Sequence, residues 1–284
     1  MKSTNLTIFL LVLFTVPADV NAFKICAFNI KSFGDAKAAN ESIMAVLVKI
    51  LTRCDICLIQ EVRDMKGTAI STLMKKLNRF DGSHSYSHIE SERLGRNIYK
   101  EQYIFIYRAD IVQVKDSYQY KKNEKEDSET FCRKPFIVRV YSPTTVIQDF
   151  VLVSQHTCPK DAVKEMDELY EVFQEVRGHW QTENVMFLGD FNAACSYVSA
   201  KDWKTIRLRN SLDFYWLIGD KEDTTVSEKT CCAYDRIVIH GQEFIQSVIP
   251  GSAKPFNFKK EFGLSEEEVL GVVLIADINK DLKC

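Results

Sequence analysis

The sequence predicts an α/β fold in one large domain, and two patterns support this prediction. Short apolar runs rich in β-branched and aromatic residues alternate with longer segments whose apolar residues recur at helical spacing. No internal repeat, Gly/Ser-rich linker or low-complexity stretch divides residues 23–284, and their number lies within the range of a single large domain. The most polar stretch, Lys121 to Thr130, is predicted to be an exposed loop.

The first residues have the features of a secretory signal peptide. Lys2 precedes an apolar stretch from Ile8 to Val16 that is too short to span a bilayer. Val20-Asn21-Ala22 has small or permissive residues where signal peptidase cuts, so residues 1–22 are the predicted signal peptide and Phe23 the mature start. A membrane anchor is the alternative. No other apolar run is long enough for a transmembrane helix, so we expect secretion through the endoplasmic reticulum without stable membrane insertion.

Six apolar runs are predicted to be strands, and two amphipathic segments are predicted to be helices. From Asp161 to Arg177 the apolar residues recur at helical spacing while charged residues occupy the other face. Ser42 to Leu51 has an apolar face of the same period. The predicted strands are Phe23–Phe28, Cys57–Ile59, Tyr103–Tyr107, Phe150–Val153, Val185–Leu188 and Ile237–Ile239.

Basic and acidic residues nearly balance, which limits what overall charge implies about partners. The chain has 37 Lys and Arg against 39 Asp and Glu, a formal net charge of −2. Removing the signal peptide takes away one residue of each sign, Lys2 and Asp19, and leaves this value unchanged. Binding to nucleic acid would therefore depend on a local basic patch rather than on net charge.

Nine cysteines in a chain predicted to be exported indicate disulfide bonds, and the odd number leaves at least one thiol without an intramolecular partner. The pairing does not follow from the sequence. Cys54 and Cys57 have a spacing found in zinc sites, but no second Cys or His pair completes a site, so we do not predict zinc. Asn40-Glu41-Ser42 is a glycosylation sequon before a predicted helix, and export makes Asn40 a candidate glycosylation site.

Polar residues able to do chemistry stand at the ends of the predicted strands. Each of them alone is more often a turn residue, a helix cap or a structural hydrogen-bonding group. In packed α/β sheets, however, strand ends present side chains to a common crevice. Together they predict an acidic, oxygen-rich pocket that suits Mg²⁺, Ca²⁺ or Mn²⁺. The residues are Asn29, Glu61, His156, Asp190, Asn192 and Asp235.

Five segments carry a specific resemblance: Phe28-Asn29-Ile30, Gln60-Glu61-Val62-Arg63-Asp64, the run from Leu94 to Glu101, Gly189-Asp190-Phe191-Asn192-Ala193 and the run from Cys232 to Val238. In their residues, order and spacing they resemble the deoxyribonuclease I family and its paralogues. The runs Trp216 to Asp220 and Glu222 to Thr225 resemble the gamma-type members most. The resemblance extends from about residue 23 to residue 270 and implies a four-layer sandwich of two packed, mixed β-sheets with helices on both outer faces.

The resemblance also implies roles for the pocket residues. Glu61 would be the main metal ligand, with Asn29 beside it, and Mg²⁺ and Ca²⁺ would be the cofactors. Asp190 and Asn192 would orient the phosphate and the attacking water. The implied substrate is double-stranded DNA, gripped by Arg63, Arg96, Tyr99 and Arg133, of which Arg63 and Tyr99 would reach into the minor groove.

Two carboxylate–histidine pairs do the acid/base chemistry in this family. Glu101 and His156 resemble one pair, and Asp235 resembles the carboxylate of the other. A carboxylate bonded to imidazole fixes its tautomer and stabilises its cation. The family's main structural disulfide matches Cys195 and Cys232.

The histidine of the second pair is missing. After a segment like Leu264 to Leu270 the family continues to Ser-Asp-His, an aromatic residue and Pro-Val-Glu in its last core strand, whereas this chain has Gly271 to Asn279 and no histidine after His240. Val272 to Ile275 is apolar enough to take that strand's place. The single domain is therefore predicted to cover residues 23–284 with an atypical C-terminus from about 271. Two explanations stay open: an alternative transcript or mispredicted last exon of an active nuclease gene, or a genuine product with weak or no activity.

Smaller departures concern partners. The run Ser154-Gln155-His156-Thr157-Cys158 stands where the family commonly has Pro-Leu-His-Thr/Ala, and it adds an unusual cysteine, Cys158, beside the site. His88 and Glu90 stand where actin-binding members carry an aromatic residue and a valine, so we do not predict tight actin binding. The basic tail of gamma-type members is absent, which argues against access to chromatin. We expect a secreted monomer, with nuclear presence left open.

Three classes of function follow. The first is a divalent-metal-dependent DNA endonuclease impaired by the missing histidine. The second is a nuclease-fold protein that binds DNA without cutting it. The third is another phosphoesterase on the same fold, acting on inositol phosphates, sphingomyelin or abasic DNA, against which the DNA-gripping residues Arg63 and Tyr99 argue.

Overall fold

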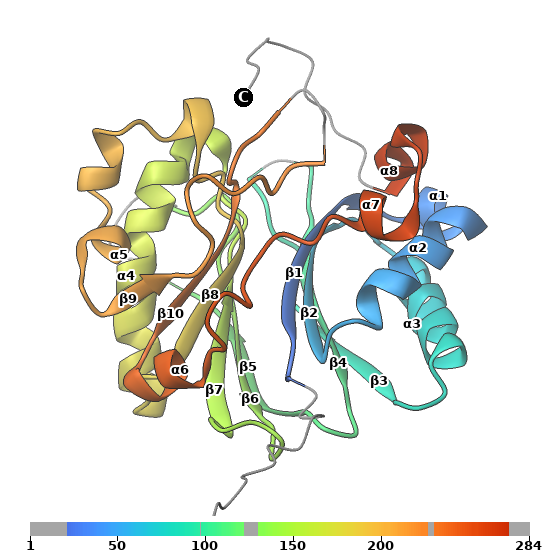
Figure 1. The fold of residues 1–284 in the computed structure, drawn as a ribbon, viewed down its shortest axis with the longest axis horizontal. Coiled ribbons are helices and arrows are strands. Elements are labelled where there is room, and N and C mark those ends of the chain that lie inside the picture. The colour runs from blue at the N-terminus through green and yellow to red at the C-terminus, as the bar shows by residue number, and fades with distance from the viewer. Residues whose placement is uncertain (1–21, 97, 122–129, 227–229, 273–284) are drawn as a thin grey trace, which may run out of the picture.

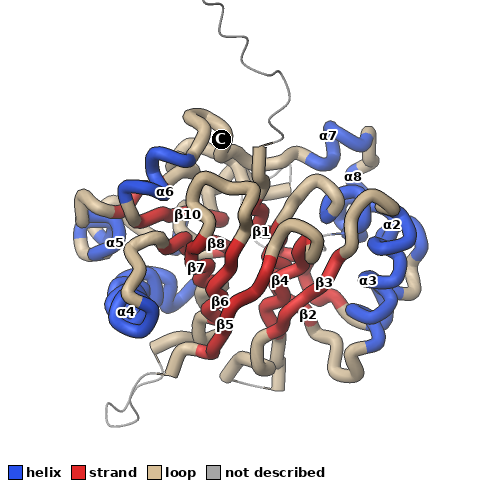
Figure 2. Tube along the Cα trace, turned by 90° about the horizontal axis from the view of Figure 1, so that it is seen from below, coloured by secondary structure: helices blue, strands red, loops and turns tan. Residues whose placement is uncertain are grey.

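The computed structural model describes residues 22–96, 98–121, 130–226 and 230–272. Two β-sheets lie face to face, and helices cover the outer face of each sheet (Figures 1 and 2). Both faces of each sheet are apolar, because one face packs on the other sheet and one on helices. The predicted α/β sandwich of four layers is thereby confirmed.

The first sheet has the strand order β1-β2-β4-β3. The pair β1 and β2 is parallel, and the other neighbours are antiparallel. In chain order its strands are β1 (Ile25–Phe33), β2 (Ile56–Val62), β3 (Tyr86–Glu90) and β4 (Gln102–Arg108). The helices on its outer side are α1 (Asp35–Ala38), α2 (Glu41–Leu51), α3 (Thr68–Phe80), α7 (Phe258–Phe262) and α8 (Glu266–Val272).

The second sheet has the strand order β5-β6-β7-β8-β10-β9, in which the pair β7 and β8 is parallel. Its strands are β5 (Gln113–Gln119), β6 (Phe136–Tyr141), β7 (Asp149–Ser154), β8 (Val185–Asp190), β9 (Phe214–Trp216) and β10 (Asp235–His240). The long helix α4 (Ala162–Trp180) covers its outer face together with α5 (Arg207–Asn210), and α6 (Gln242–Ser247) follows β10 (Figure 1).

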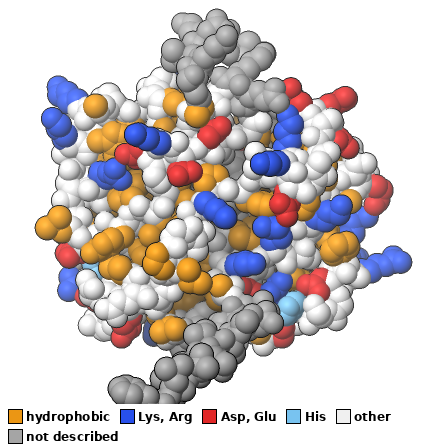
Figure 3. Space-filling model, in the orientation of Figure 1, with side chains coloured by type: hydrophobic (Ala, Val, Ile, Leu, Met, Phe, Trp, Pro, Cys, Tyr) orange, Lys and Arg blue, Asp and Glu red, His pale blue; other side chains and the backbone are white. Residues whose placement is uncertain are grey.

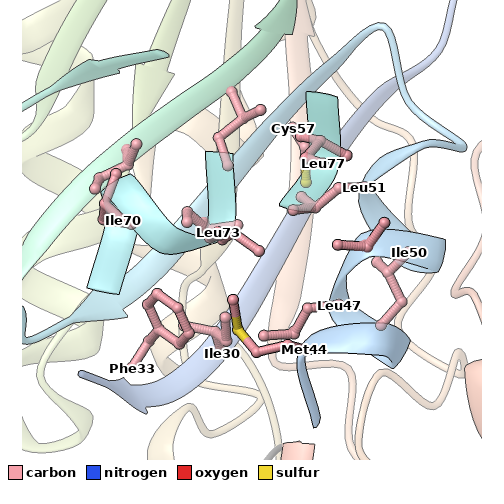
Figure 4. Close-up of a cluster of buried hydrophobic side chains, with 14 of the residues drawn as sticks. Ile30, Phe33, Met44, Leu47, Ile50, Leu51, Cys57, Ile70, Leu73 and Leu77 are labelled. Carbon is pink, nitrogen blue, oxygen red and sulfur yellow. The ribbon is translucent and has the colours of Figure 1, made fainter. Parts of the chain in front are cut away.

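Three buried apolar clusters hold the layers together. One lies between the sheets, and the other two lie between each sheet and its helices. The helix α3 shows why the layers form, since its buried residues recur every three or four positions and give it one apolar face. Figure 4 shows the cluster in which β1 meets α2 and α3 through Ile30, Phe33, Met44, Leu47 and Leu73.

The structure corrects the predicted boundaries. The first strand is Ile25–Phe33 rather than Phe23–Phe28, so Asn29 lies within β1 instead of after it. The other five predicted strands are β2, β4, β7, β8 and β10, each extended into polar residues because the ladder of backbone hydrogen bonds continues there. The predicted helices Ser42–Leu51 and Asp161–Arg177 are α2 and α4 with slightly shifted ends.

The sequence did not predict β3, β5, β6, β9 or α3. In β5 exposed and half-buried positions dominate, and β9 has three residues, so neither gives a clear apolar run. In α3 polar and charged residues separate the apolar ones. The segment therefore contains no long apolar run, and the helix was not predicted.

The prediction that Val272 to Ile275 takes the place of the last core strand is wrong at its first residue. Val272 ends α8 and is buried, and its carbonyl accepts a hydrogen bond from Nζ of Lys37 at 2.6 Å. Residues 273–275 of that prediction, residues 1–21 of the predicted signal peptide and residues 122–129 of the predicted loop lie outside the described residues. In the part of the chain that is described, no helix has the length and apolarity to cross a membrane.

Candidate active site

The polar residues from the strand ends meet at one edge of the sandwich. The first sheet supplies two of them from β1 and β2, and the second sheet supplies four from β8, β10 and the segments that follow β7 and β8. The pocket therefore spans both sheets. Its residues are Asn29, Glu61, His156, Asp190, Asn192 and Asp235.

Asn29 joins two carboxylates across the sheets. Its Nδ2 donates to Oε1 of Glu61 at 3.0 Å and to Oδ2 of Asp190 at 3.3 Å, and its Oδ1 accepts from the backbone N–H of Lys31 at 2.9 Å. The backbone N–H of Ser32 donates to Oε2 of Glu61 at 3.2 Å. The two carboxylates are thus held close together, where a cation would offset their mutual repulsion.

Several residues around the pocket have left-handed backbone conformations. The φ angle is 59° at Glu61 and 46° at Asn192, and it is also positive at Lys31 and Ser32. Such φ values are uncommon for residues other than glycine and are held in place by surrounding contacts, often at functional sites. Here they occur at Glu61, whose carboxylate bonds Asn29, and at Asn192, whose backbone N–H bonds Asp190.

Gln60 links the two sheets beneath the pocket, and the sequence analysis did not select it. Its buried Nε2 donates to the carbonyl of Gln155 at 2.7 Å, and its Oε1 accepts from the backbone N–H of Asp190 at 3.0 Å. Gly189 has φ 130°, and a Cβ there would lie 2.5 Å from Gln60 Nε2, so the close approach requires glycine. Gln60 thereby fixes Asp190 relative to Glu61. The sequence signal that could have indicated this role is Gln60 itself, a polar residue in an otherwise apolar, buried run before Glu61.

His156 and Glu101 form a buried pair. Nδ1 of His156 lies 2.6 Å from Oε1 of Glu101, and the backbone N–H of His156 donates to the Tyr103 hydroxyl at 2.8 Å. Nε2 faces the pocket, 4.0 Å from Oε1 of Glu61 and 3.9 Å from Oδ2 of Asp190. Burial is the largest single effect and would lower the pKa of His156, but the charge and hydrogen bond of Glu101 and the charge of Asp190 together outweigh it and hold this pKa above its ordinary value.

Arg133 is the third member of this arrangement. Its Nε lies 2.7 Å from Oε1 of Glu101, and its Nη1 donates to the carbonyl of His156 at 3.1 Å. Burial alone would raise the pKa of Glu101, but the charges and hydrogen bonds of His156 and Arg133 hold it below its ordinary value. The resemblance implied that Arg133 grips DNA, and this stays a prediction. The structure places its largely buried side chain against Glu101 and the carbonyl of His156.

Asp235 begins β10 opposite Asp190 in the antiparallel register. Burial and the charge of Asp190 raise the pKa of Asp235 to about 7, against the lowering effect of a hydrogen bond with the Thr224 side chain. Within the described ranges, no histidine hydrogen-bonds the Asp235 carboxylate. Asn192 is fixed nearby, because its backbone N–H donates to Oδ1 of Asp190 and its Nδ2 to the carbonyl of Thr157, each at 3.0 Å.

The donor set of the pocket fits a hard divalent cation. Glu61 and Asp190 offer carboxylate oxygens, which Mg²⁺ and Ca²⁺ prefer, and a soft metal would want the sulfur ligands that this group lacks. Asn29 would offer its amide oxygen only after its side-chain amide turns, because Oδ1 is bonded to the Lys31 N–H. The prediction of Mg²⁺, Ca²⁺ or Mn²⁺ is consistent with these residues and stays a prediction.

The other residues predicted to contact DNA differ in what they bind within the protein. The Arg63 guanidinium stacks on the Tyr99 ring, 4.3 Å from its centroid, and Tyr99 is 66% exposed. Arg96, three residues before Tyr99, forms an ion pair through Nη1 with Asp161 at 2.8 Å. Acidic and basic side chains are interspersed on the face that Figure 3 shows, in keeping with the small net charge.

Three disulfides join described cysteines: Cys26–Cys54, Cys132–Cys158 and Cys195–Cys232. Since Cys54 is bonded to Cys26, it is not half of a zinc site with Cys57. The free thiols among the described residues are Cys57, whose pKa burial raises to about 12, and Cys231, which is exposed. Asn40 is exposed and caps α2 by accepting from the backbone N–H of Ile43 at 3.1 Å, and its glycosylation stays a prediction.

Comparison with known proteins places the chain in a family. Residues 26–256 match the Endonuclease/Exonuclease/phosphatase family. Over 252 residues the chain is 50% identical to deoxyribonuclease gamma of Homo sapiens, covering 88% of this chain and 83% of that protein. It is 48% identical to deoxyribonuclease-1 of Sus scrofa, covering 88% of each. The solved structure of an endonuclease/exonuclease/phosphatase from Bacteroides vulgatus has the same fold, with a TM-score of 0.55 at 16% identity over 78% of this chain and 87% of that one. The chain therefore belongs to the endonuclease/exonuclease/phosphatase family, in its deoxyribonuclease I branch.

Proposed function

We propose that the protein is a secreted, divalent-metal-dependent endonuclease that hydrolyses phosphodiester bonds of double-stranded DNA. The observation that carries the proposal is the pocket in which Asn29, Glu61 and Asp190 meet the His156–Glu101 pair. The similarity to relatives named deoxyribonucleases supports DNA as the substrate. Secretion is supported by the predicted signal peptide and by the three disulfides.

The metal-binding residues would be Glu61 and Asn29, with Asp190 beside them. When bound, a divalent cation would supply positive charge against the negative charge that grows on the phosphoryl oxygens. Asp190 and Asn192 would orient the phosphate and the attacking water, because Asn192 is held by its hydrogen bonds to Asp190 and to Thr157.

His156 would act at its Nε2 atom. Because the Glu101 carboxylate accepts a hydrogen bond from Nδ1–H, the nitrogen that can gain and lose a proton is Nε2, which faces the pocket. A pKa above the ordinary value keeps the imidazolium available near neutral pH, which suits protonation of the departing sugar oxygen. Asp235 would take the proton of the attacking water, and it would do so without an imidazole partner.

The stacked pair of Arg63 and Tyr99 would contact the DNA duplex. An exposed aromatic ring with a guanidinium held on its face presents a flat apolar surface and a positive charge together, which suits insertion between phosphate-lined groove walls. This surface also favours DNA over the small phosphoester substrates of other proteins with this fold.

A nuclease-fold protein that binds DNA without cutting it is the second candidate. It is favoured by Asp235, which has no imidazole partner among the described residues, and by the lack of any histidine after His240 in the sequence. Equal affinity for DNA with and without Mg²⁺ and Ca²⁺, together with no nicking, would support this candidate.

The test is a plasmid-nicking assay on purified protein with Mg²⁺ and Ca²⁺, against the same protein in EDTA. We expect relaxed plasmid to accumulate with the metals and not in EDTA. Nicking that EDTA leaves unchanged would contradict the metal requirement. No nicking by a folded protein that still retards plasmid in a gel would leave the DNA-binding candidate.

A further inference from the structure

Glu165 is a buried carboxylate in the first turn of α4, and the proposed chemistry does not use it. Its Oε1 accepts from the backbone N–H of Cys132 at 3.2 Å and from that of Cys158 at 3.1 Å. Its Oε2 accepts from Nε2 of Gln155 at 2.8 Å. Glu165 is 0% exposed, and burial raises its pKa to about 7. Burying a carboxylate costs free energy because it loses its hydration, and the three hydrogen bonds offset part of that cost.

The two segments that Glu165 joins are also joined by the Cys132–Cys158 disulfide. A carboxylate and a disulfide therefore fix the same two stretches of backbone, which are far apart in sequence. We call Glu165 and this disulfide the brace. Cys158, the unusual cysteine beside His156, thus has a partner in Cys132.

Each segment that the brace holds delivers one group to the candidate active site. Arg133 directly follows Cys132, and its Nε bonds Glu101. His156 stands two residues before Cys158, and its Nδ1 bonds the same oxygen of Glu101. Nη1 of Arg133 also donates a hydrogen bond to the carbonyl of His156, so the two segments contact each other directly as well as through Glu101. A shift of either segment would change the geometry at Glu101.

We propose that Glu165 is a positioning residue for the His156–Glu101 pair, acting through the backbone of Cys132 and Cys158, and that the Cys132–Cys158 disulfide holds the same arrangement. The proposal rests on the proposed nuclease function. Glu165 itself touches neither substrate nor metal. Its removal loosens the placement of Arg133 and His156 and leaves the DNA-binding surface at Arg63 and Tyr99 intact.

The experiment compares Glu165→Ala, Glu165→Gln and the control Val172→Ala by plasmid nicking. Val172 is a fully buried residue of the same helix, seven residues after Glu165, and its side chain packs in an apolar cluster, so its variant measures general destabilisation. We expect Glu165→Ala to lower kcat by about tenfold or more with little change in KM, as removal of an outer-shell partner does. Val172→Ala should keep kcat at a temperature where both variants are folded.

Glu165→Gln should restore most of the lost rate. Its amide oxygen can accept from both backbone N–H groups. Its amide nitrogen can donate to Oε1 of Gln155 once the Gln155 amide turns over, because Nε2 of Gln155 faces Glu165 in the wild type and Oε1 is buried without a hydrogen-bond partner among the described residues. If Glu165→Ala is not recovered in a folded state, Glu165→Asp takes its place. It keeps the charge and withdraws the carboxylate by one methylene, and the same loss in kcat is expected.

A second readout does not depend on activity. In a ¹H–¹⁵N spectrum the Nε–H of Arg133, held against Glu101, should give a protected signal in the wild type, in Glu165→Gln and in Val172→Ala. Loss of that signal in Glu165→Ala supports the brace even if the wild-type protein nicks no DNA, an outcome that would overturn only the proposed function. An unchanged Arg133 signal with unchanged kcat in folded Glu165→Ala, or an equal loss in Val172→Ala, would overturn the inference.

Discussion

Glu101 uses a single oxygen, Oε1, for both His156 and Arg133, at 2.6 Å from Nδ1 of the first and 2.7 Å from Nε of the second. The orientation of the carboxylate therefore depends on the guanidinium, and the orientation of the imidazole depends on the carboxylate. Arg133 is thus connected to the proposed chemistry, in addition to any contact with a phosphate.

Arg133→Ala should lower kcat by about tenfold or more, because Glu101 loses one of the two groups that hold it. The dependence of DNA affinity on salt should stay the same, since the partly buried guanidinium is already paired. Nicking kinetics and a binding titration at several salt concentrations measure the two effects. An unchanged kcat with a weaker salt dependence would instead assign Arg133 to gripping a phosphate.

Glu61→Ala and Asp190→Ala should each abolish nicking while the protein is still secreted and folded. Both carboxylates bond the Asn29 amide, and each removal takes away a proposed anchor for metal or phosphate. The assay is plasmid nicking with Mg²⁺ and Ca²⁺, and thermal unfolding verifies the fold. Glu90→Ala, an exposed carboxylate on β3, is the matched control. Nicking retained by either pocket variant would refute the role of that residue.

Arg63→Ala should weaken binding to many DNA sequences alike and reduce the slope of log affinity against log salt by about one, because one phosphate contact is lost. Arg79→Ala is the control, since Arg79 is an exposed residue in the last turn of α3, outside the proposed DNA-binding surface. A fluorescence titration over a range of salt concentrations gives both slopes. Equal slopes for wild type and Arg63→Ala would contradict the DNA-binding surface proposed for Arg63 and Tyr99.

Much of the pocket could be predicted from the sequence because its residues flank short apolar runs that form the strands. Asp190 comes directly after four apolar residues and a glycine, and Glu61 comes directly after three apolar residues and Gln60, so the same pattern predicted both. Their convergence was expected because strand ends of packed sheets face a shared crevice. The resemblance to a family added Glu101, which lies outside the described strands.

Contacts between distant segments could not be predicted in this way. Gln60 and Glu165 act by bonding backbone groups of other elements, and no local pattern marks which carbonyl or N–H will be opposite. The pairing of Cys132 with Cys158 likewise depends on the fold, since nine cysteines allow many pairings. The position of Val272 in α8 rather than in a strand was missed because a short apolar run fits either element.

The buried carboxylate of Glu165 should make stability depend on pH in a particular direction. Burial raises its pKa from 4.5 to about 7, so the folded state binds this proton more tightly than the unfolded state. The stability contributed by the proton is complete below about pH 4.5 and is lost as pH rises to about 7, by up to about 3 kcal/mol. Glu165→Gln does not titrate, so its melting temperature should rise relative to that of the wild type as pH goes from about 4.5 to about 7. A difference in melting temperature that stays constant across this range would contradict the raised pKa.

The last prediction concerns the missing histidine and starts from Asp235, which β10 holds opposite Asp190 whether or not an imidazole is present. Without an adjacent imidazole to accept and release the proton, Asp235 alone serves the attacking water, so this chain should nick DNA at least about a hundredfold more slowly than a relative with both pairs. Replacing everything after Leu270 with a family-like segment containing Ser-Asp-His-Tyr-Pro-Val-Glu should recover most of that loss, because the other pocket residues are present. The control is the same graft with alanine in place of its histidine. It shows whether any gain in rate comes from the imidazole or from the new C-terminal segment alone. Full activity in the chain as written would mean that His156 or solvent suffices to take the proton from Asp235. No gain in rate in a folded graft would mean that the defect lies elsewhere in the site. Gln155 and Cys158, beside His156, would then be the next residues to change.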